Sequence, residues 1–130
     1  IIEGADEFLS FLRQKNIPHG LLTRNSKVVT DLTLKKFNWN FEFALTRDCC
    51  RHKPDPEGLH IMAKAWKIDP CQIIYVGDYK FDIETAQNAG MKSGLLINDK
   101  NKGFSGLADI SFDKYEQLKT ILFSKDRDNL

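Results

Sequence analysis

The chain has 130 residues, of which 42% are apolar and 28% are charged, so length and composition predict a single globular domain. Intrinsically disordered and collagen-like classes are excluded, because the first has fewer apolar residues and the second a regular glycine repeat. The 19 Lys and Arg residues stand against 18 Asp and Glu residues, a net charge of +1. This balance argues against nucleic acid or a membrane surface as the partner and favours a small ligand.

The sequence contains no apolar run near the roughly 20 residues that a membrane-spanning helix needs. Residues 1–15 mix acidic and apolar positions, which is not the order of a secretory signal. The three cysteines are Cys71 and the adjacent pair Cys49 and Cys50, which do not form a disulfide framework, so we expect a reducing, cytoplasmic compartment. Only two arginines near the pair would lower a thiol pKa, so we expect a structural role for both thiols.

Hydrophobic periodicity predicts alternating helices and strands along the chain. In chain order the predicted elements are a helix over 5–15, a strand over 19–23, a helix over 27–37, a strand over 41–46, a helix over 57–66, a strand over 73–76, a helix over 81–88, a strand over 94–97, a strand over 108–112 and a helix over 114–123. Asn25 or Ser26 is expected to cap the second helix, and Gly90 to end the fourth. The strands are continuous apolar runs, which is typical of a parallel sheet covered by helices, so the predicted fold is a Rossmann-like α/β three-layer sandwich.

Chemically useful side chains follow three of the predicted strands. In a parallel α/β sheet, ligands bind outside the carboxyl ends of the strands, so Thr23, Lys53, Asp78 and Asp82 are expected to meet at one rim. Asp78 follows Gly77, which allows a sharp turn, and Asp82 comes four residues later at the start of a helix. Two such carboxylates suit Mg²⁺; the alternative is that Asp78 caps the helix and that Asp82 favours the helix dipole.

The segment after the first strand is a candidate phosphate site. Thr23 offers a hydroxyl, and the amides of Arg24 and Asn25 precede a helix, which together would bind an oxyanion; a simple helix cap is the alternative. Lys53 precedes Pro54, which favours an extended, outward-facing backbone and leaves a surface lysine as its alternative.

Four segments carry a family resemblance: Leu-Leu-Thr-Arg-Asn at 21–25, Arg-His-Lys-Pro-Asp-Pro at 51–56, Val-Gly-Asp-Tyr-Lys-Phe-Asp at 76–82 and Ala-Gln-Asn-Ala-Gly at 86–90. Their order resembles the haloacid dehalogenase-like hydrolase superfamily, in particular its phosphoglycolate-phosphatase-like members. The resemblance implies a Mg²⁺-dependent phosphatase acting on a small phosphate ester. It implies that Thr23 binds the phosphoryl group, that Lys53 neutralises charge, and that Asp78 and Asp82 hold Mg²⁺.

The first motif of that family, Asp-x-Asp on the first strand, does not precede Thr23. The one literal match, Asp126-Arg127-Asp128, lies in a polar tail. In the family the first of these aspartates is the nucleophile, so the chain as given is expected to be inactive, with its nucleophile, first strand and cap upstream of residue 1. We therefore interpret residues 1–123 as the carboxyl-terminal part of the core domain and 124–130 as a tail. The missing strand would be central, so its neighbours would have open edges.

Two alternatives use the same residues. One is a nucleophile-less relative that binds a phosphorylated ligand or a protein without chemistry. The other is a phosphoacceptor receiver domain, which also groups Asp, Thr and Lys around Mg²⁺. In a receiver domain the acidic pair comes early and the lysine late, whereas here Lys53 precedes Asp78. This order disfavours the receiver domain.

Overall fold

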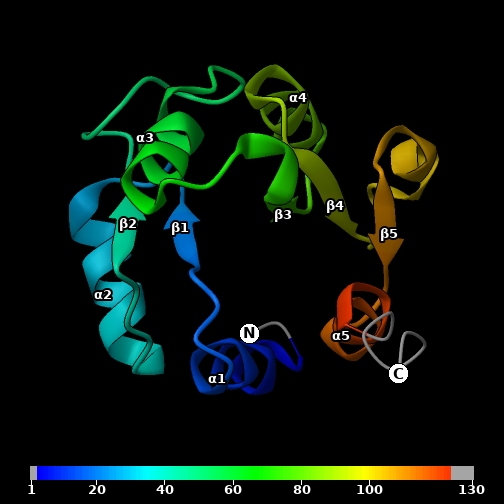
Figure 1. Ribbon diagram of the computed structural model, residues 1–130, viewed down its shortest axis with the longest axis horizontal. Coiled ribbons are helices and arrows are strands. Elements are labelled where there is room, and N and C mark those ends of the chain that lie inside the picture. Colours follow the sequence, from blue (N-terminus) through cyan, green and yellow to red (C-terminus); the bar gives the residue numbers. More distant parts are fainter. Residues whose placement is uncertain (1–2, 124–130) are drawn as a thin grey trace.

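The computed structural model describes residues 3–123, and helices alternate with strands along them (Figure 1). The elements are α1 (Ala5–Gln14), β1 (Gly20–Leu22), α2 (Lys27–Phe37), β2 (Phe43–Leu45), α3 (Glu57–Trp66), the 3₁₀ turn η1 (Pro70–Gln72), β3 (Ile74–Gly77), α4 (Lys80–Ala89), β4 (Lys92–Leu96), the 3₁₀ segment η2 (Lys102–Leu107), β5 (Ile110–Phe112) and α5 (Tyr115–Phe123). The predicted polar tail, residues 124–130, lies outside the described residues, and so does its Asp-x-Asp.

The helix boundaries follow from local chemistry. The predicted bounds of α2 and α3 are confirmed, and Ser26 rather than Asn25 caps α2, with its Oγ accepting from the N–H of Val29 at 3.2 Å. Helix α4 ends at Gly90, which has a φ of 76° in the left-handed region that glycine adopts without strain. The strands are shorter than most of the apolar runs that predicted them, and neither 3₁₀ segment was predicted.

The strands pair in parallel, as the apolar runs predicted, but they form two sheets rather than one. Strand β1 pairs with β2, and β4 lies between β3 and β5. Figure 1 shows β1 and β2 on one side of the molecule and β3 to β5 on the other. Among the described residues no strand pairs with the second edge of β1 or of β3. These two strand edges are therefore unpaired.

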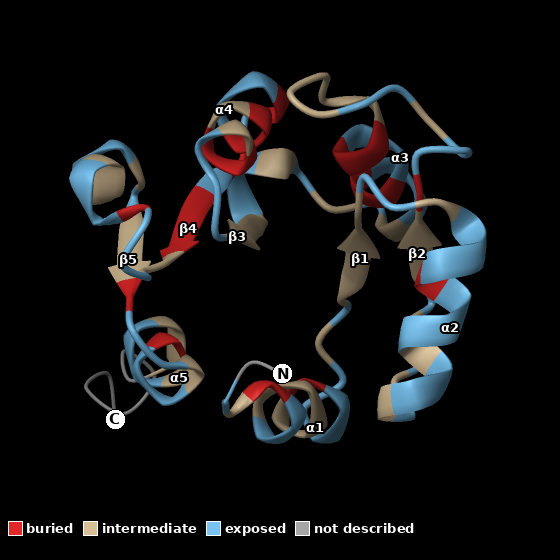
Figure 2. Ribbon diagram, turned by 180° about the vertical axis from the view of Figure 1, so that it is seen from behind, coloured by how far each residue is buried: buried red, intermediate tan, exposed pale blue. Residues whose placement is uncertain are grey.

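Helices α3 and α4 connect the two sheets. They pack against each other, α3 against β1 and α4 against β3 and β4. Their core consists of buried Leu59, Met62, Ala63, Ala86, Ala89 and Met91, against which Leu22, Phe43, Leu45, Trp66, Ile73 and Tyr75 pack. Buried residues gather on α3, α4 and β4 in Figure 2. This packing brings the end of β3 close to the loop before α3.

Helices α1 and α5 pack together away from this core. The aromatic pair of Phe8 and Tyr115 has ring centroids 5.3 Å apart, and that of Phe11 and Phe123 has centroids 4.9 Å apart. Aromatic pairs of this spacing contribute beyond the apolar area that they bury. Within residues 3–123, no helix combines the length and apolar character that crossing a membrane requires.

Candidate functional site

Lys53 and Asp82 form a buried ion pair. The Lys53 Nζ lies 2.7 Å from Asp82 Oδ1, and the two side chains are only 13% and 8% exposed. The hydroxyl of Tyr75, on β3, donates to the same oxygen at 3.2 Å, and Nζ lies 5.7 Å from the Tyr75 ring centroid. Lys53 is therefore an inward-facing lysine, and the alternative of a solvated surface lysine does not describe it.

The second oxygen of Asp82 holds the start of α4. Asp82 Oδ2 accepts from the backbone N–H groups of Asp78 and Tyr79, each at 3.1 Å. Tyr79 is the N-cap residue of α4, so the alternative in which Asp78 caps the helix is wrong. Asp82 lies in the first turn, where a carboxylate favours the helix dipole, and it completes the capping box. A Cβ at Gly77 would overlap the Asp82 carboxylate, so this close approach, rather than a sharp turn, requires glycine there.

Asp78 is the second acidic residue of the site, and its carboxylate is open to a ligand. Asp78 is exposed, and within residues 3–123 no hydrogen bond or ion pair to its carboxylate is found. Burial and, second, the charge of Asp78 raise the pKa of the Tyr115 phenol. The part of the chain that the structure describes has no group of three or more His, Cys, Asp or Glu placed to hold a metal. Mg²⁺ usually takes only one or two protein carboxylates and keeps several waters, so one free carboxylate beside Asp82 fits it as part of a site.

Thr23 lies at the end of β1, where its N–H donates to Leu45 O at 3.0 Å. Its Oγ1 accepts from the N–H of Asn25 at 3.1 Å, whereas no hydrogen bond from the N–H of Arg24 is found in residues 3–123. The guanidinium of Arg24 lies 5.8 Å from the ring centroid of Phe81, in the first turn of α4. Since Ser26 caps α2, Thr23 does not act as the helix cap.

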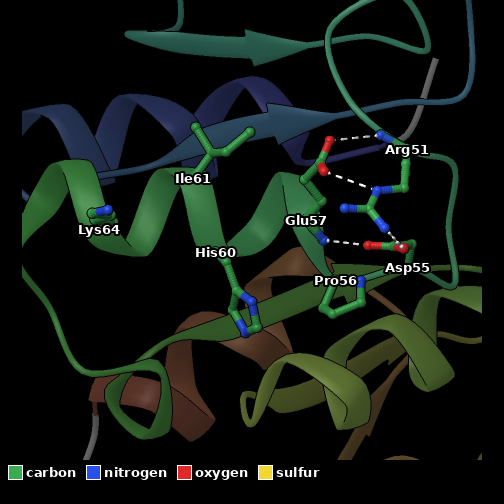
Figure 3. Close-up of a pocket in the computed structure, with 7 residues that line it drawn as sticks. All are labelled: Arg51, Asp55, Pro56, Glu57, His60, Ile61 and Lys64. Carbon is green, nitrogen blue, oxygen red and sulfur yellow. Dashed lines mark hydrogen bonds and ion pairs between the residues drawn. The ribbon is translucent and has the colours of Figure 1, made fainter.

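The loop before α3 is held by charged side chains. Arg51 contacts Glu57 through its N–H and its Nε, both at 3.0 Å, and its Nη1 lies 3.6 Å from Asp55 (Figure 3). These residues line a surface pocket of about 330 Å³ beside α3 that includes none of the predicted site residues. Lys53 faces inward to Asp82, whereas the sequence predicted an outward-facing segment, and its bond to Pro54 is cis.

Two residues of this region were missed from the sequence. Tyr75 was assigned only to a strand, and Asn101 to a polar loop. Asn101 is 1% exposed, and its Nδ2 donates to the backbone oxygens of Asp78 and Leu96 at 2.8 and 2.9 Å. An asparagine among other loop residues carries no periodic signal that marks it as buried, so composition alone does not reveal it.

Comparison with known proteins gives the same fold. A haloacid dehalogenase-like hydrolase domain-containing protein of Arabidopsis thaliana is 33% identical, over 94% of this chain and 53% of that protein. An N-acetylmuramic acid 6-phosphate phosphatase of Pseudomonas aeruginosa is 34% identical, over 92% of this chain and 56% of that protein. A crystal structure of a HAD phosphatase from Thermococcus onnurineus superposes with a TM-score of 0.86 at 24% identity, covering 95% of this chain and 58% of that one.

The chain thus spans a little over half the length of the curated relatives it matches. Residues 1–96 match the family model described as haloacid dehalogenase-like hydrolase. This match covers the end of β1, the loop with Lys53 and the turn with Asp78 and Asp82. The chain therefore belongs to the haloacid dehalogenase-like hydrolase family.

Proposed function

We propose that this chain supplies the phosphate-binding and metal-binding part of a Mg²⁺-dependent phosphatase that acts on a small phosphate ester. The observation that carries the proposal is the buried contact of Lys53 with Asp82, 2.7 Å long, next to Asp78, whose backbone N–H donates to Asp82 and whose carboxylate is open. A cation and an unpaired carboxylate at the end of a parallel strand suit an anionic substrate together with a metal ion.

The phosphate side of the site consists of Thr23, Arg24, Asn25 and Lys53. The Thr23 hydroxyl and the N–H of Arg24 are donors for phosphoryl oxygens, and Arg24 adds a positive charge next to α4. Asn25 orients Thr23 by donating its N–H to Oγ1. Lys53 stabilises negative charge on the phosphoryl group, and Asp82 holds its ammonium group in place.

The metal side of the site consists of Asp78 and Asp82. Asp78 is the direct ligand in this proposal, because its carboxylate has no partner among the described residues. Both oxygens of Asp82 are engaged, so Asp82 contributes through a metal-bound water or by exchanging one of its hydrogen bonds. When bound, Mg²⁺ would supply positive charge to the phosphoryl oxygens, and water and substrate would complete its coordination.

We place the nucleophile on a strand outside this chain, between β1 and β3. The support is that β1 and β3 each have one edge with no partner strand among residues 3–123, and that Thr23 and Asp78 follow these two strands. A strand pairing with both edges would satisfy their backbone groups and bring its carboxyl end between the phosphate side and the metal side. The names of two relatives, a phosphoglycolate phosphatase and an N-acetylmuramic acid 6-phosphate phosphatase, support a small phosphate ester as the substrate class.

The test uses the full-length natural protein. Phosphate release from p-nitrophenyl phosphate and from a panel of small phosphate monoesters is measured with Mg²⁺ and with a chelator. Asp78→Asn is expected to abolish Mg²⁺-dependent release, because it removes the free carboxylate. Asp99→Asn is the matched control, since the Asp99 side chain is 99% exposed and pairs only at the surface with Lys102.

Unchanged turnover by Asp78→Asn would contradict the metal assignment. Tight binding of phosphate monoesters with no turnover by the full-length natural protein would instead support the nucleophile-less binding module. Thr23→Val separates the two sides of the site, because it should weaken phosphate ester binding while Mg²⁺ affinity in the absence of substrate stays unchanged.

A further inference from the structure

Asn101 is a buried amide in an exposed loop. The loop follows β4, and its neighbours Lys100 and Lys102 are exposed, whereas Asn101 itself is 1% exposed. Burial of a polar side chain is unfavourable unless its donors and acceptors find partners. Its hydrogen bonds therefore show what holds it there.

All of the polar atoms of the Asn101 amide have partners. Nδ2 donates to Asp78 O at 2.8 Å and to Leu96 O at 2.9 Å, while Oδ1 accepts from the N–H of Asn98 at 2.8 Å. The amide thus joins the turn after β3 to the end of β4 and to its own loop. Only an amide offers two donors on one atom together with an acceptor at this size, so aspartate and leucine cannot replace it.

The loop does not need the contact with Asp78 for its own turn. The Oδ1 of Asn98 accepts from the N–H groups of Lys100 and Asn101 at 2.8 and 3.0 Å, which closes the turn locally. The hydrogen bond from Asn101 Nδ2 to Asp78 O therefore joins the loop to a separate element, the turn after β3.

Asp78 is held at both ends of its backbone by side chains. Asp82 accepts from its N–H at 3.1 Å, and Asn101 donates to its carbonyl oxygen at 2.8 Å. We propose that Asn101 is a positioning residue, which fixes the backbone of Asp78 so that its carboxylate is preorganised for the divalent cation. This inference rests on the proposed function and adds to it a residue outside the four resembling segments. Residues that orient a metal ligand typically contribute about 10- to 100-fold to metal affinity.

The test compares Asn101→Ala and Asn101→Asp in the full-length natural protein. Isothermal titration with Mg²⁺ alone gives affinity without substrate, and the Mg²⁺ dependence of phosphate release gives a second readout. Both variants are expected to bind Mg²⁺ about tenfold more weakly. The KM for substrate at saturating Mg²⁺ should stay close to that of the unmodified protein.

Ser93→Ala is the matched structural control. Ser93 is 1% exposed in β4, and its Oγ exchanges hydrogen bonds with Asp109 at 3.3 and 3.0 Å, but it does not contact Asp78. Its loss should lower the Tm while leaving Mg²⁺ affinity unchanged. If Asn101 contributed to stability alone, Asn101→Ala would likewise lower the Tm and leave Mg²⁺ affinity unchanged.

A folded Asn101→Ala protein with unchanged Mg²⁺ affinity would overturn the inference and leave the proposed function intact. If Asn101→Ala and Asn101→Asp do not fold, Asn101→Ser, which keeps one donor, replaces them in the test. Its Mg²⁺ affinity is expected to lie between that expected for Asn101→Ala and that of the unmodified protein. Absence of Mg²⁺ binding by the unmodified protein would instead overturn the proposed function. Asp78→Asn, which lacks the proposed ligand, shows the titration expected when Mg²⁺ binding is lost.

Discussion

Lys53 Nζ and Asp82 Oδ1 lie 2.7 Å apart in a region where both side chains are almost fully buried. The two residues come from different elements, the loop before α3 and the first turn of α4. Each charge is tolerated there because the other compensates it, and Tyr75 and two backbone N–H groups complete the hydrogen bonding of the carboxylate. The pair therefore links the stability of the fold to the geometry of the site.

Lys53→Met should destabilise the folded chain by about 3 kcal/mol, because it leaves the Asp82 charge buried without its partner. Urea unfolding at pH 7 measures the loss. Lys27→Met is the control, since Lys27 pairs with Asp31 at the surface, and no measurable change is expected for it. The double variant Lys53→Met with Asp82→Asn should recover part of the loss, and equal destabilisation by Lys27→Met and Lys53→Met would contradict the prediction.

Gly77→Ala should lower stability by about 2 kcal/mol, because the new methyl group must displace the Asp82 carboxylate. The displacement also weakens the hydrogen bonds from Asp78 and Tyr79, so weaker Mg²⁺ binding should accompany the lower Tm. Gly103→Ala is the matched control, as a Cβ there meets no atom within 4 Å. Thermal unfolding followed by circular dichroism compares the two, and an equal Tm for both would refute the crowding at Gly77.

Tyr75 should make the fold sensitive to alkaline pH. Burial and, second, the Asp82 carboxylate raise the pKa of its phenol well above the ordinary value of about 10. Because the unfolded chain loses this proton first, the stabilisation is complete below pH 10 and declines as the pH rises above it. Unfolding free energies of the unmodified chain and Tyr75→Phe between pH 8 and pH 11 give the measurement. A smaller alkaline loss in Tyr75→Phe is expected, and equal slopes would contradict it.

Cys49 should react with alkylating agents faster than Cys50. Cys49 is exposed, and the contact of its Sγ with the Thr46 hydroxyl at 3.5 Å lowers its pKa, whereas burial raises the pKa of Cys50. The structural role that the sequence predicted for both thiols stays a prediction for Cys49, whose side chain is exposed. Iodoacetamide labelling followed by peptide mass spectrometry measures both rates. Thr46→Val should slow labelling of Cys49 at pH 7, and an unchanged rate would rule out the hydroxyl as the cause.

Local sequence determined most of the elements. Capping and helix-ending residues act over a few neighbours, so Ser26 and Gly90 mark helix ends in the sequence as they do in the structure. The carboxyl ends of β1 and β3 were likewise predictable, because an apolar run followed by Thr23 or Asp78 defines them without any knowledge of packing.

Tertiary structure decided the roles within the site. The spacing of Asp78 and Asp82 predicted two carboxylates that can face one cation, but packing of α4 against β3 directs Asp82 to backbone N–H groups and Lys53, and leaves Asp78 open. The inward turn of Lys53 depends on a partner 29 residues away. Burial of Asn101 depends on the ends of two strands, and the division into two sheets depends on which strands meet. A sequence specifies local periodicity and caps directly, whereas burial and long-range hydrogen bonds exist only once distant segments pack together.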